Sequence, residues 1–173
     1  MKSILLFFVL ICFAVTAENS FSADFRLNQI LDGDSLEVIT GKGERIIVHL
    51  AGIDAPEMPT GKSDKGQPFC KHAHKFLSDL VVNKQFSFQA ESRIIDHQVL
   101  AVVYSDNRNV NLEMIKAGFA EAYQGAALPP EFDLGPYKKE EAASKKLKKG
   151  MWALGQVYMS PSEWRKANTK SSQ

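Results

Sequence analysis

The sequence predicts a small, mainly β domain, a closed barrel of five short strands with about three helices packed around it. Two observations predict this fold class. Five runs rich in β-branched and aromatic residues are separated by turn residues, and apolar residues recur at helical spacing after the third run. Without an N-terminal apolar segment, about 150 residues remain, enough for one domain with a sizeable core.

The five runs are joined by short turns. A tight turn at Asp32-Gly33 follows the first run, and a second turn at Gly41-Lys42-Gly43 separates the second from the third. In the third run Ile46, Val48 and Leu50 alternate onto one face. The predicted strands cover residues 25–31, 36–39, 45–50, 84–89 and 99–104.

Two helices are predicted in the middle of the chain. Pro68 is expected to start the first, in which Phe69, Phe76, Leu77 and Leu80 recur at helical spacing. The second is expected over residues 110–117. An asparagine precedes that segment as a cap, and a glycine follows it as a stop.

A third helix is predicted near the C-terminus, over residues 137–150. Its acidic residues precede its lysines, which suits both the helix dipole and ion pairs four residues apart. The lysine-rich end is expected to be a solvated face, with phosphate contact as the alternative. Beyond it, Ser160-Pro161-Ser162-Glu163 is typical of a capping box that opens a last helical turn. Trp152 and Trp164 are expected to hold this end against the body.

The chain begins with a segment typical of a secretory signal peptide. Lys2 precedes an apolar run from Ile4 to Val15, and small residues follow up to Ala17. The run is too short to span a bilayer, which needs about 20 apolar residues. We therefore expect residues 1–17 to be removed on export, with an uncleaved anchor as the alternative. The mature protein is then expected to be secreted or periplasmic, a monomer without stable membrane association.

Removal of that segment leaves Cys70 as the one cysteine, because Cys12 leaves with it. A single thiol forms no internal disulfide, and we expect Cys70 to be buried. A zinc site with His72 and His74 is an alternative, although on a helix only Cys70 and His74 share a face.

Charge is distributed unevenly along the chain. Without Lys2 there are 20 basic and 20 acidic residues, of which nine basic and three acidic residues follow from Tyr137 onward. A basic end beside an acidic body is compatible with a polyanionic partner. The chain is nevertheless far less basic than a dedicated nucleic-acid-binding protein usually is.

Three carboxylates, Asp34, Asp54 and Glu57, lie at the ends of two strand-like runs. Carboxylates seldom gather beside apolar strands unless a positive charge offsets their repulsion. A hard divalent cation, held by oxygen ligands from two loops, is the economical candidate. Glu57 follows the stiff Pro56 and could then act on a water molecule. Each piece taken alone is also compatible with an ordinary turn or loop.

The two pieces together resemble the signature of the staphylococcal nuclease-like (thermonuclease) family. Asp32-Gly33-Asp34-Ser35 is followed by Leu50-Ala51-Gly52-Ile53-Asp54-Ala55-Pro56-Glu57, and weaker matches continue in order to Trp152. The resemblance implies an OB-fold, a five-stranded barrel that often presents oligonucleotide sites on its strand faces and loops. It places the domain at residues 24–154, with a C-terminal tail at 155–173.

The resemblance also implies a site and an activity. In this family, carboxylates at the positions matching Asp34 and Asp54 hold a calcium ion, together with the main-chain carbonyl at the position matching Ala55. A glutamate matching Glu57 is assigned as the general base for the attacking water. The implied protein is an exported, Ca²⁺-dependent nuclease that hydrolyses phosphodiester bonds of DNA or RNA.

The chain departs from the family at both arginines that clamp the phosphate. His49 occupies the position of the first, and Gln98 that of the second, two residues before Leu100-Ala101. Loss of one preorganised donor to a developing oxyanion reduces the rate by about 10²–10³. We therefore expect a weakened nuclease, with Arg93 as the nearest cation in sequence to the altered hairpin.

Two alternatives to this reading remain open. The first is a catalytically inactive barrel that binds nucleic acid or another polyanion. The second is a structural domain in which the same groups are merely solvated.

Overall fold

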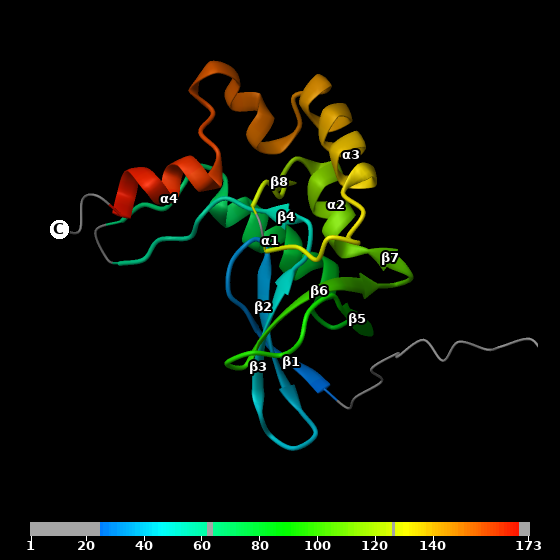
Figure 1. Ribbon diagram of the computed structural model, residues 1–173. Helices are drawn as coiled ribbons and strands as arrows, with labels where there is room; N and C mark the ends of the chain where they lie inside the picture. The colour runs from blue at the N-terminus through cyan, green and yellow to red at the C-terminus, as the bar shows by residue number, and fades with distance from the viewer. Residues whose placement is uncertain (1–24, 62–63, 126, 170–173) are drawn as a thin grey trace, which may run out of the picture.

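The computed structural model describes residues 25–61, 64–125 and 127–169 (Figure 1), so the predicted signal segment lies outside the described residues. The predicted fold class is confirmed. Five strands form one curled sheet, and the helices gather at one end of it, opposite the β2–β3 turn. The five strands are β1 (Phe25–Ile30), β2 (Ser35–Thr40), β3 (Arg45–Leu50), β5 (Phe86–Ala90) and β6 (Gln98–Ser105).

The sheet has the strand order β1-β2-β3-β6-β5. The first three strands form an antiparallel meander, β3 pairs with β6 in parallel, and β5 pairs with β6 antiparallel. The two outer strands meet through side chains: the ring of Phe25 lies 5.3 Å from that of Phe86 and 4.7 Å from that of Phe88. Within the described residues the barrel therefore closes by aromatic packing, and no strand pair joins β1 to β5.

Three very short strands accompany this sheet. β4 (Ile53–Asp54) pairs antiparallel with β8 (Glu121–Ala122), and β7 (Arg108–Asn109) pairs with β6. Two residues cannot display an alternating pattern, so none of these strands was predicted. The β4–β8 pair is important for the site because β4 carries Asp54.

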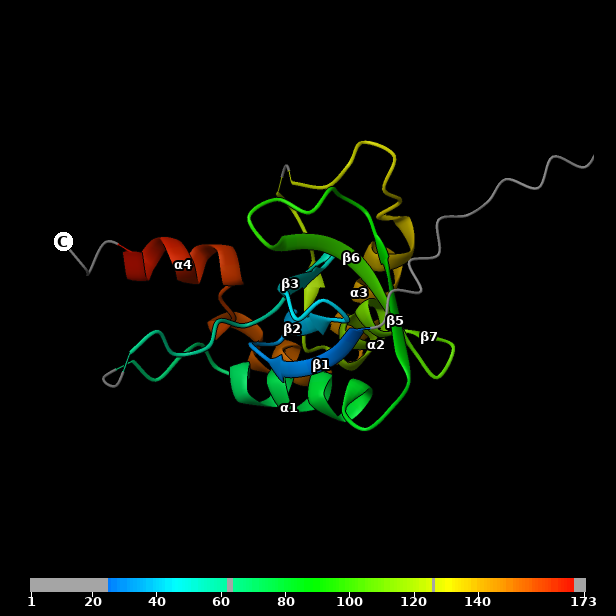
Figure 2. The same cartoon turned by 90° about the horizontal axis from the view of Figure 1, so that it is seen from below.

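The described residues form five helical segments, which gather at the end of the sheet opposite the β2–β3 turn. Figure 2 shows α1 running beside β1, while α2 and α3 lie together at the far end of β6. None of the described helices is both long enough and apolar enough to cross a bilayer. The segments are α1 (Cys70–Val81), α2 (Val110–Ala117), α3 (Gly135–Lys146), the 3₁₀ helix η1 (Gly150–Val157) and α4 (Pro161–Thr169).

The predicted ends of α2 and the start of α4 are confirmed in detail. The side chain of Asn109 accepts a hydrogen bond from the amide of Leu112 at 2.9 Å, and Gly118 ends the helix with φ 75°. At the start of α4, Ser160 Oγ accepts from the amide of Glu163 at 3.2 Å. In return, Glu163 Oε2 accepts from the amide of Ser160 at 2.9 Å, which completes the capping box.

Two helix boundaries differ from the prediction because of backbone conformation, and α3 also begins at Gly135, before the predicted Tyr137. α1 begins at Cys70 and not at Pro68, because Phe69 adopts a left-handed conformation with φ 71°. α3 ends at Lys146 and not at Gly150, because Lys148 already has φ 50°. Both departures come from positive-φ residues other than glycine, which a sequence pattern rarely indicates.

Cys70 is buried, with 3% of its surface exposed, as predicted. Burial also raises the pKa of its thiol. His74 Nε2 lies 3.3 Å from the carbonyl oxygen of Ile30. Nothing in the described part of the chain brings three or more His, Cys, Asp or Glu side chains together as a metal site.

The core between the sheet and α2 contains one buried polar side chain that joins several elements. Asn111 has 0% of its surface exposed. Its Oδ1 accepts from the amide of Val103 at 3.0 Å, and its Nδ2 donates to the carbonyls of Ala51 (2.8 Å) and Ala101 (3.1 Å). The Asn111 amide thus replaces a strand partner of β6 where β3 has ended.

We expect Asn111→Ala to lower the free energy of unfolding by about 1–3 kcal/mol, because it leaves buried backbone groups without partners. Urea denaturation of the variant and the wild type measures this. Gln89→Ala, at an exposed position of β5, is the control and should have a smaller effect. Equal effects of the two substitutions would contradict the bridging role of Asn111.

Candidate active site

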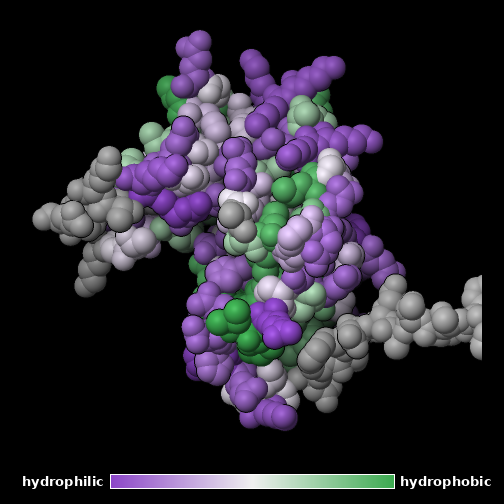
Figure 3. Space-filling model, in the orientation of Figure 1, coloured by the Kyte–Doolittle hydropathy of each residue, from purple (hydrophilic) through white to green (hydrophobic). Residues whose placement is uncertain are grey.

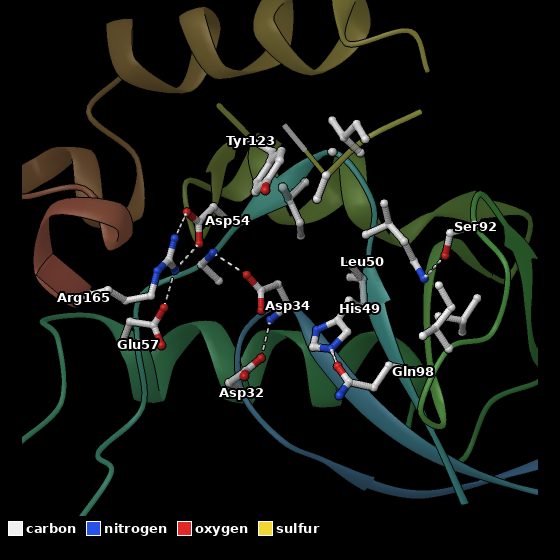
Figure 4. Close-up of a pocket in the computed structure, with 18 of the residues that line it drawn as sticks. Asp32, Asp34, His49, Leu50, Asp54, Glu57, Ser92, Gln98, Tyr123 and Arg165 are labelled. Carbon is white, nitrogen blue, oxygen red and sulfur yellow. Dashed lines mark hydrogen bonds and ion pairs between the residues drawn. The ribbon is translucent and has the colours of Figure 1, made fainter. Parts of the chain in front are cut away.

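The residues singled out from the sequence line one cleft of about 690 Å³ beside the ends of β3 and β6. Figure 4 shows the carboxylates on one side of this cleft and the polar residues of β3 and β6 on the other. Apolar side chains gather in the middle of the molecular face seen in Figure 3 and are bordered by polar ones. The predicted site residues in the lining are Asp34, His49, Asp54, Ala55, Glu57 and Gln98.

Asp34 joins the two halves of the sequence motif. Its Oδ2 accepts a hydrogen bond from the amide of Ala55 at 2.7 Å. Its own amide donates to Asp32 Oδ1 at 2.9 Å, which holds the turn before β2. A Cβ atom at Gly33 would lie 2.7 Å from the Cβ atoms of Ala55 and Ala73, so only glycine permits this close approach.

The surroundings of Asp34 favour its neutral form. Burial, and then the charges of Asp32 and Asp54, raise the pKa of Asp34 well above its ordinary value. Some of its surface nevertheless remains open to the cleft. No described residue near Asp34 fully offsets the repulsion between its charged form and the neighbouring carboxylates of Asp32 and Asp54. A cation bound there would reduce this repulsion.

Asp54 lies on β4 with 7% of its surface exposed and is paired with a cationic side chain from the far end of the sequence. Arg165 of α4 donates from Nη1 to Asp54 Oδ1 at 2.9 Å and from Nη2 to Oδ2 at 2.8 Å. The same Nη1 also contacts Glu57 Oε1. The hydrogen bonds to Asp54, and to a smaller extent the one to Glu57, raise the pKa of the Arg165 guanidinium, which therefore remains charged.

Glu57 is positioned through its backbone by a buried glutamine. The amide of Glu57 donates to Gln67 Oε1 at 3.1 Å, and the amide of Gln67 donates to the carbonyl of Glu57 at 2.9 Å. Gln67 has only 4% of its surface exposed. It also donates from Nε2 to the carbonyl of Met159 at 2.8 Å, which links the Glu57 loop to the segment before α4.

His49 and Gln98 contact each other across the parallel β3–β6 pair. His49 Nε2 lies 2.9 Å from Gln98 Oε1. The hairpin before β6 turns at Asp96 and His97, whose φ values are 49° and 60°. This tight turn directs the Gln98 side chain into the cleft beside His49. The strands therefore supply hydrogen-bonding groups at this wall, but neither side chain carries a permanent charge.

The donor set fits a hard divalent cation by its chemistry. Two carboxylates, those of Asp34 and Asp54, line one cleft together with Ala55, and carboxylate and carbonyl oxygens are the ligands that such a cation prefers. The bidentate guanidinium on Asp54 is a cation already bound by one of these carboxylates.

Sequence reasoning did not identify Arg165, Gln67 or Tyr123 as cleft or supporting residues. Arg165 reaches Asp54 across 111 residues, and no local pattern marks such a contact. Arg93, noted in the sequence as the nearest cation to the hairpin, does line the cleft.

Asp34→Asn should raise the melting temperature of the cation-free protein at pH 7. Because its pKa is raised in the fold, ionised Asp34 destabilises the folded state as the pH rises above the ordinary value of 3.8. Asparagine removes the charge and keeps an oxygen acceptor for Ala55, and the gain should shrink toward pH 4. Thermal unfolding with chelator between pH 4 and 8 measures it. Asp79→Asn, at an exposed position of α1, is the control, and a lower melting temperature for Asp34→Asn at pH 7 would contradict the prediction.

Comparison with known proteins supports the resemblance seen in the sequence. The model of the staphylococcal nuclease homologue family matches residues 47–154. An uncharacterized endonuclease of Haemophilus influenzae is 36% identical over 166 residues, 95% of this chain and 86% of the relative. A micrococcal nuclease of Shigella flexneri is 30% identical over 163 residues, 87% of this chain and 86% of the relative.

A fungal relative is longer. A probable endonuclease of Candida tropicalis is 33% identical over 137 residues, 73% of this chain but 56% of the relative. The family match spans the strands and loops that carry most of the cleft, and two bacterial relatives match nearly the whole chain. The chain therefore belongs to the staphylococcal nuclease homologue family.

Proposed function

We propose that this protein is a nuclease that hydrolyses phosphodiester bonds of DNA or RNA in the cleft beside β3 and β6. The observation that carries the proposal is the Asp34–Ala55 hydrogen bond, which brings Asp34 into one cleft with Asp54 and Glu57. Relatives over nearly the whole chain bear the names endonuclease and micrococcal nuclease, which supports the same activity.

Calcium is the proposed cofactor, held by the carboxylates of Asp34 and Asp54 and the carbonyl of Ala55. When bound, the ion would polarise a phosphate oxygen and offset the charge that develops on it. The carboxylates themselves would not touch the substrate. They would act on it through the calcium ion that they hold. The chemistry of the donor set supports calcium, because hard divalent cations prefer oxygen ligands.

Glu57 is the proposed general base. Its backbone is fixed on both sides by Gln67, so its carboxylate is held at the edge of the cleft, where it can accept a proton from water. The Arg165 guanidinium contacts Glu57 Oε1, so it must leave that oxygen before the oxygen can accept a proton from water.

His49 and Gln98 are the proposed phosphate-contacting groups of the strands. Their ring and amide N–H groups can donate hydrogen bonds to phosphate oxygens from the wall opposite the carboxylates. Without permanent charge they stabilise a developing oxyanion less than two guanidinium groups would. A slow enzyme is the expected consequence.

The proposal includes export to the periplasm or the medium, as a monomer. Its support is the charged and apolar N-terminal segment in the sequence, residues 1–17. N-terminal sequencing of the protein recovered from the producing cells tests it, since a chain beginning after Ala17 is expected.

Glu57→Gln should reduce cleavage of single-stranded DNA or RNA by about 10²–10⁴, the usual contribution of a general base. The measurement is the cleavage rate of a labelled oligonucleotide at pH 5 to 10, in calcium and in chelator. Chelator should abolish wild-type cleavage, and Glu131→Gln, at an exposed position, should leave the rate unchanged. Cleavage that survives chelator, or survives Glu57→Gln, would refute this mechanism.

The double variant His49→Arg, Gln98→Arg should cleave at least about tenfold faster than the wild type, because both groups then carry charge toward the phosphate. The same oligonucleotide assay measures this increase. No gain in rate would contradict the placement of these residues at the phosphate. If cleavage appears only in the double variant, the natural protein is an inactive module that binds polyanions.

A further inference from the structure

We propose that Arg165, carried by the C-terminal helix α4, is a phosphate-binding residue of the cleft. It holds Asp54 and Glu57 while no cation is bound, and it turns to the substrate phosphate once a divalent cation takes Asp54. The proposal rests on the proposed nuclease function and adds to it a substrate-contacting residue from outside the strands.

The position of Arg165 is the first argument. Its guanidinium is bidentate on Asp54, at 2.9 and 2.8 Å, and also contacts Glu57. If Asp54 held a divalent cation and Glu57 accepted a proton from the attacking water, the scissile phosphate would have to lie beside both side chains. Arg165 thus already lies where the substrate phosphate would bind.

The segment before α4 packs against the rest of the domain, and these contacts fix the position of the helix that carries Arg165. The ring of Tyr158 packs 4.6 Å from that of Trp152, and its hydroxyl donates to the buried carboxylate of Glu121. The carbonyl of Met159 accepts from Gln67, the residue that also fixes the backbone of Glu57. The base and the helix that carries Arg165 are therefore held by one side chain.

The start of α4 is also fixed. The capping box between Ser160 and Glu163 sets the first turn of the helix, and Pro161 is buried beneath it. Arg165 follows one turn later. The first turn of α4 thereby determines which residue of the helix faces the carboxylates.

The charge of the cleft is the second argument. Among the described residues that line it, the permanently charged cations are Arg93 and Arg165, against five carboxylates. A phosphodiester needs positive charge, and neither of the strand residues His49 and Gln98 carries a permanent charge. The lining carboxylates are Asp32, Asp34, Asp54, Glu57 and Asp96.

An exchange of partners follows from the chemistry of the groups. Both Asp54 oxygens accept hydrogen bonds from Arg165, so a divalent cation held by Asp54 would take the place of the guanidinium there. The helix remains tied to the body through Tyr158 and Met159. The planar fork of a guanidinium suits phosphate as well as carboxylate, so the arriving substrate offers Arg165 an equivalent partner.

Three full-length variants test the proposal: Arg165→Ala, Arg165→Lys and, as a matched control, Lys166→Ala, which removes one positive charge from the next position of the same helix. Calcium affinity is measured by calorimetry without substrate, and cleavage of a single-stranded oligonucleotide is measured at saturating calcium. Arg165→Ala should bind calcium severalfold more tightly and cleave about 10²–10³-fold more slowly. Arg165→Lys should retain part of the rate, and Lys166→Ala should stay within about twofold of the wild type in both measurements.

Other outcomes overturn the proposal. If Arg165→Ala binds calcium more tightly and cleaves as fast as or faster than the wild type, Arg165 only blocks the cation and does not contact the phosphate. If it loses both calcium binding and cleavage, its role is structural. Circular dichroism and Trp164 fluorescence of each variant report whether α4 is still folded and docked.

Failure of the nuclease proposal itself has a separate signature, absence of cleavage by the wild type in calcium. In that case the affinity of the same oligonucleotide still tests the phosphate contact of Arg165. The contact is supported if Arg165→Ala binds the oligonucleotide at least about tenfold more weakly than Lys166→Ala does. The slope of log affinity against log salt concentration should also fall by about one. Equal affinities of the two variants refute it.

Discussion

The hydrogen bond from the amide of Ala55 to the carboxylate of Asp34 is the contact on which the site depends. It joins the turn before β2 to the corner after β4, and the amide of Leu50, which donates to the carbonyl of Asp34 at 2.8 Å, ties the same turn to the end of β3. The absence of a side chain at Gly33 permits it, because Ala55 and Ala73 approach that backbone closely. Helix α1 is therefore packed against the same turn, and the position of the carboxylates is fixed by the core and not by the loops alone.

Most of the fold could be predicted because its signals are local. The five main strands alternate or run apolar between turns, and both caps of α2 and the capping box of α4 are satisfied by the residues expected. What the sequence did not reveal lacks such a local signal. β4 and β8 have two residues each and exist only because they pair with each other across the chain. The altered ends of α1 and α3 depend on left-handed residues that are not glycine, Phe69 and Lys148.

The candidate site divides in the same way. The positions of Asp34, Asp54 and Glu57 in a common cleft were predictable from one compact motif. His49 and Gln98 were predicted as site residues, but the contact between them was not. Arg165 and Gln67 were not predictable, because each acts through a partner far away in sequence. A composition count hides this arrangement: the chain is nearly neutral as a whole, while its basic end lies directly against its acidic centre.

The double hydrogen bonding of Gln67 has a consequence for how this domain is delimited. The family match ends at residue 154, before Tyr158, Met159 and Arg165. A protein trimmed at that border would leave one end of Gln67 without its carbonyl acceptor and remove a guanidinium from two carboxylates. Asp54 and Glu57 would then lack this neighbouring positive charge, so the activity of the trimmed protein would differ from that of the whole chain. The contacts of the cleft residues thus extend past the homology boundary to the last described helix.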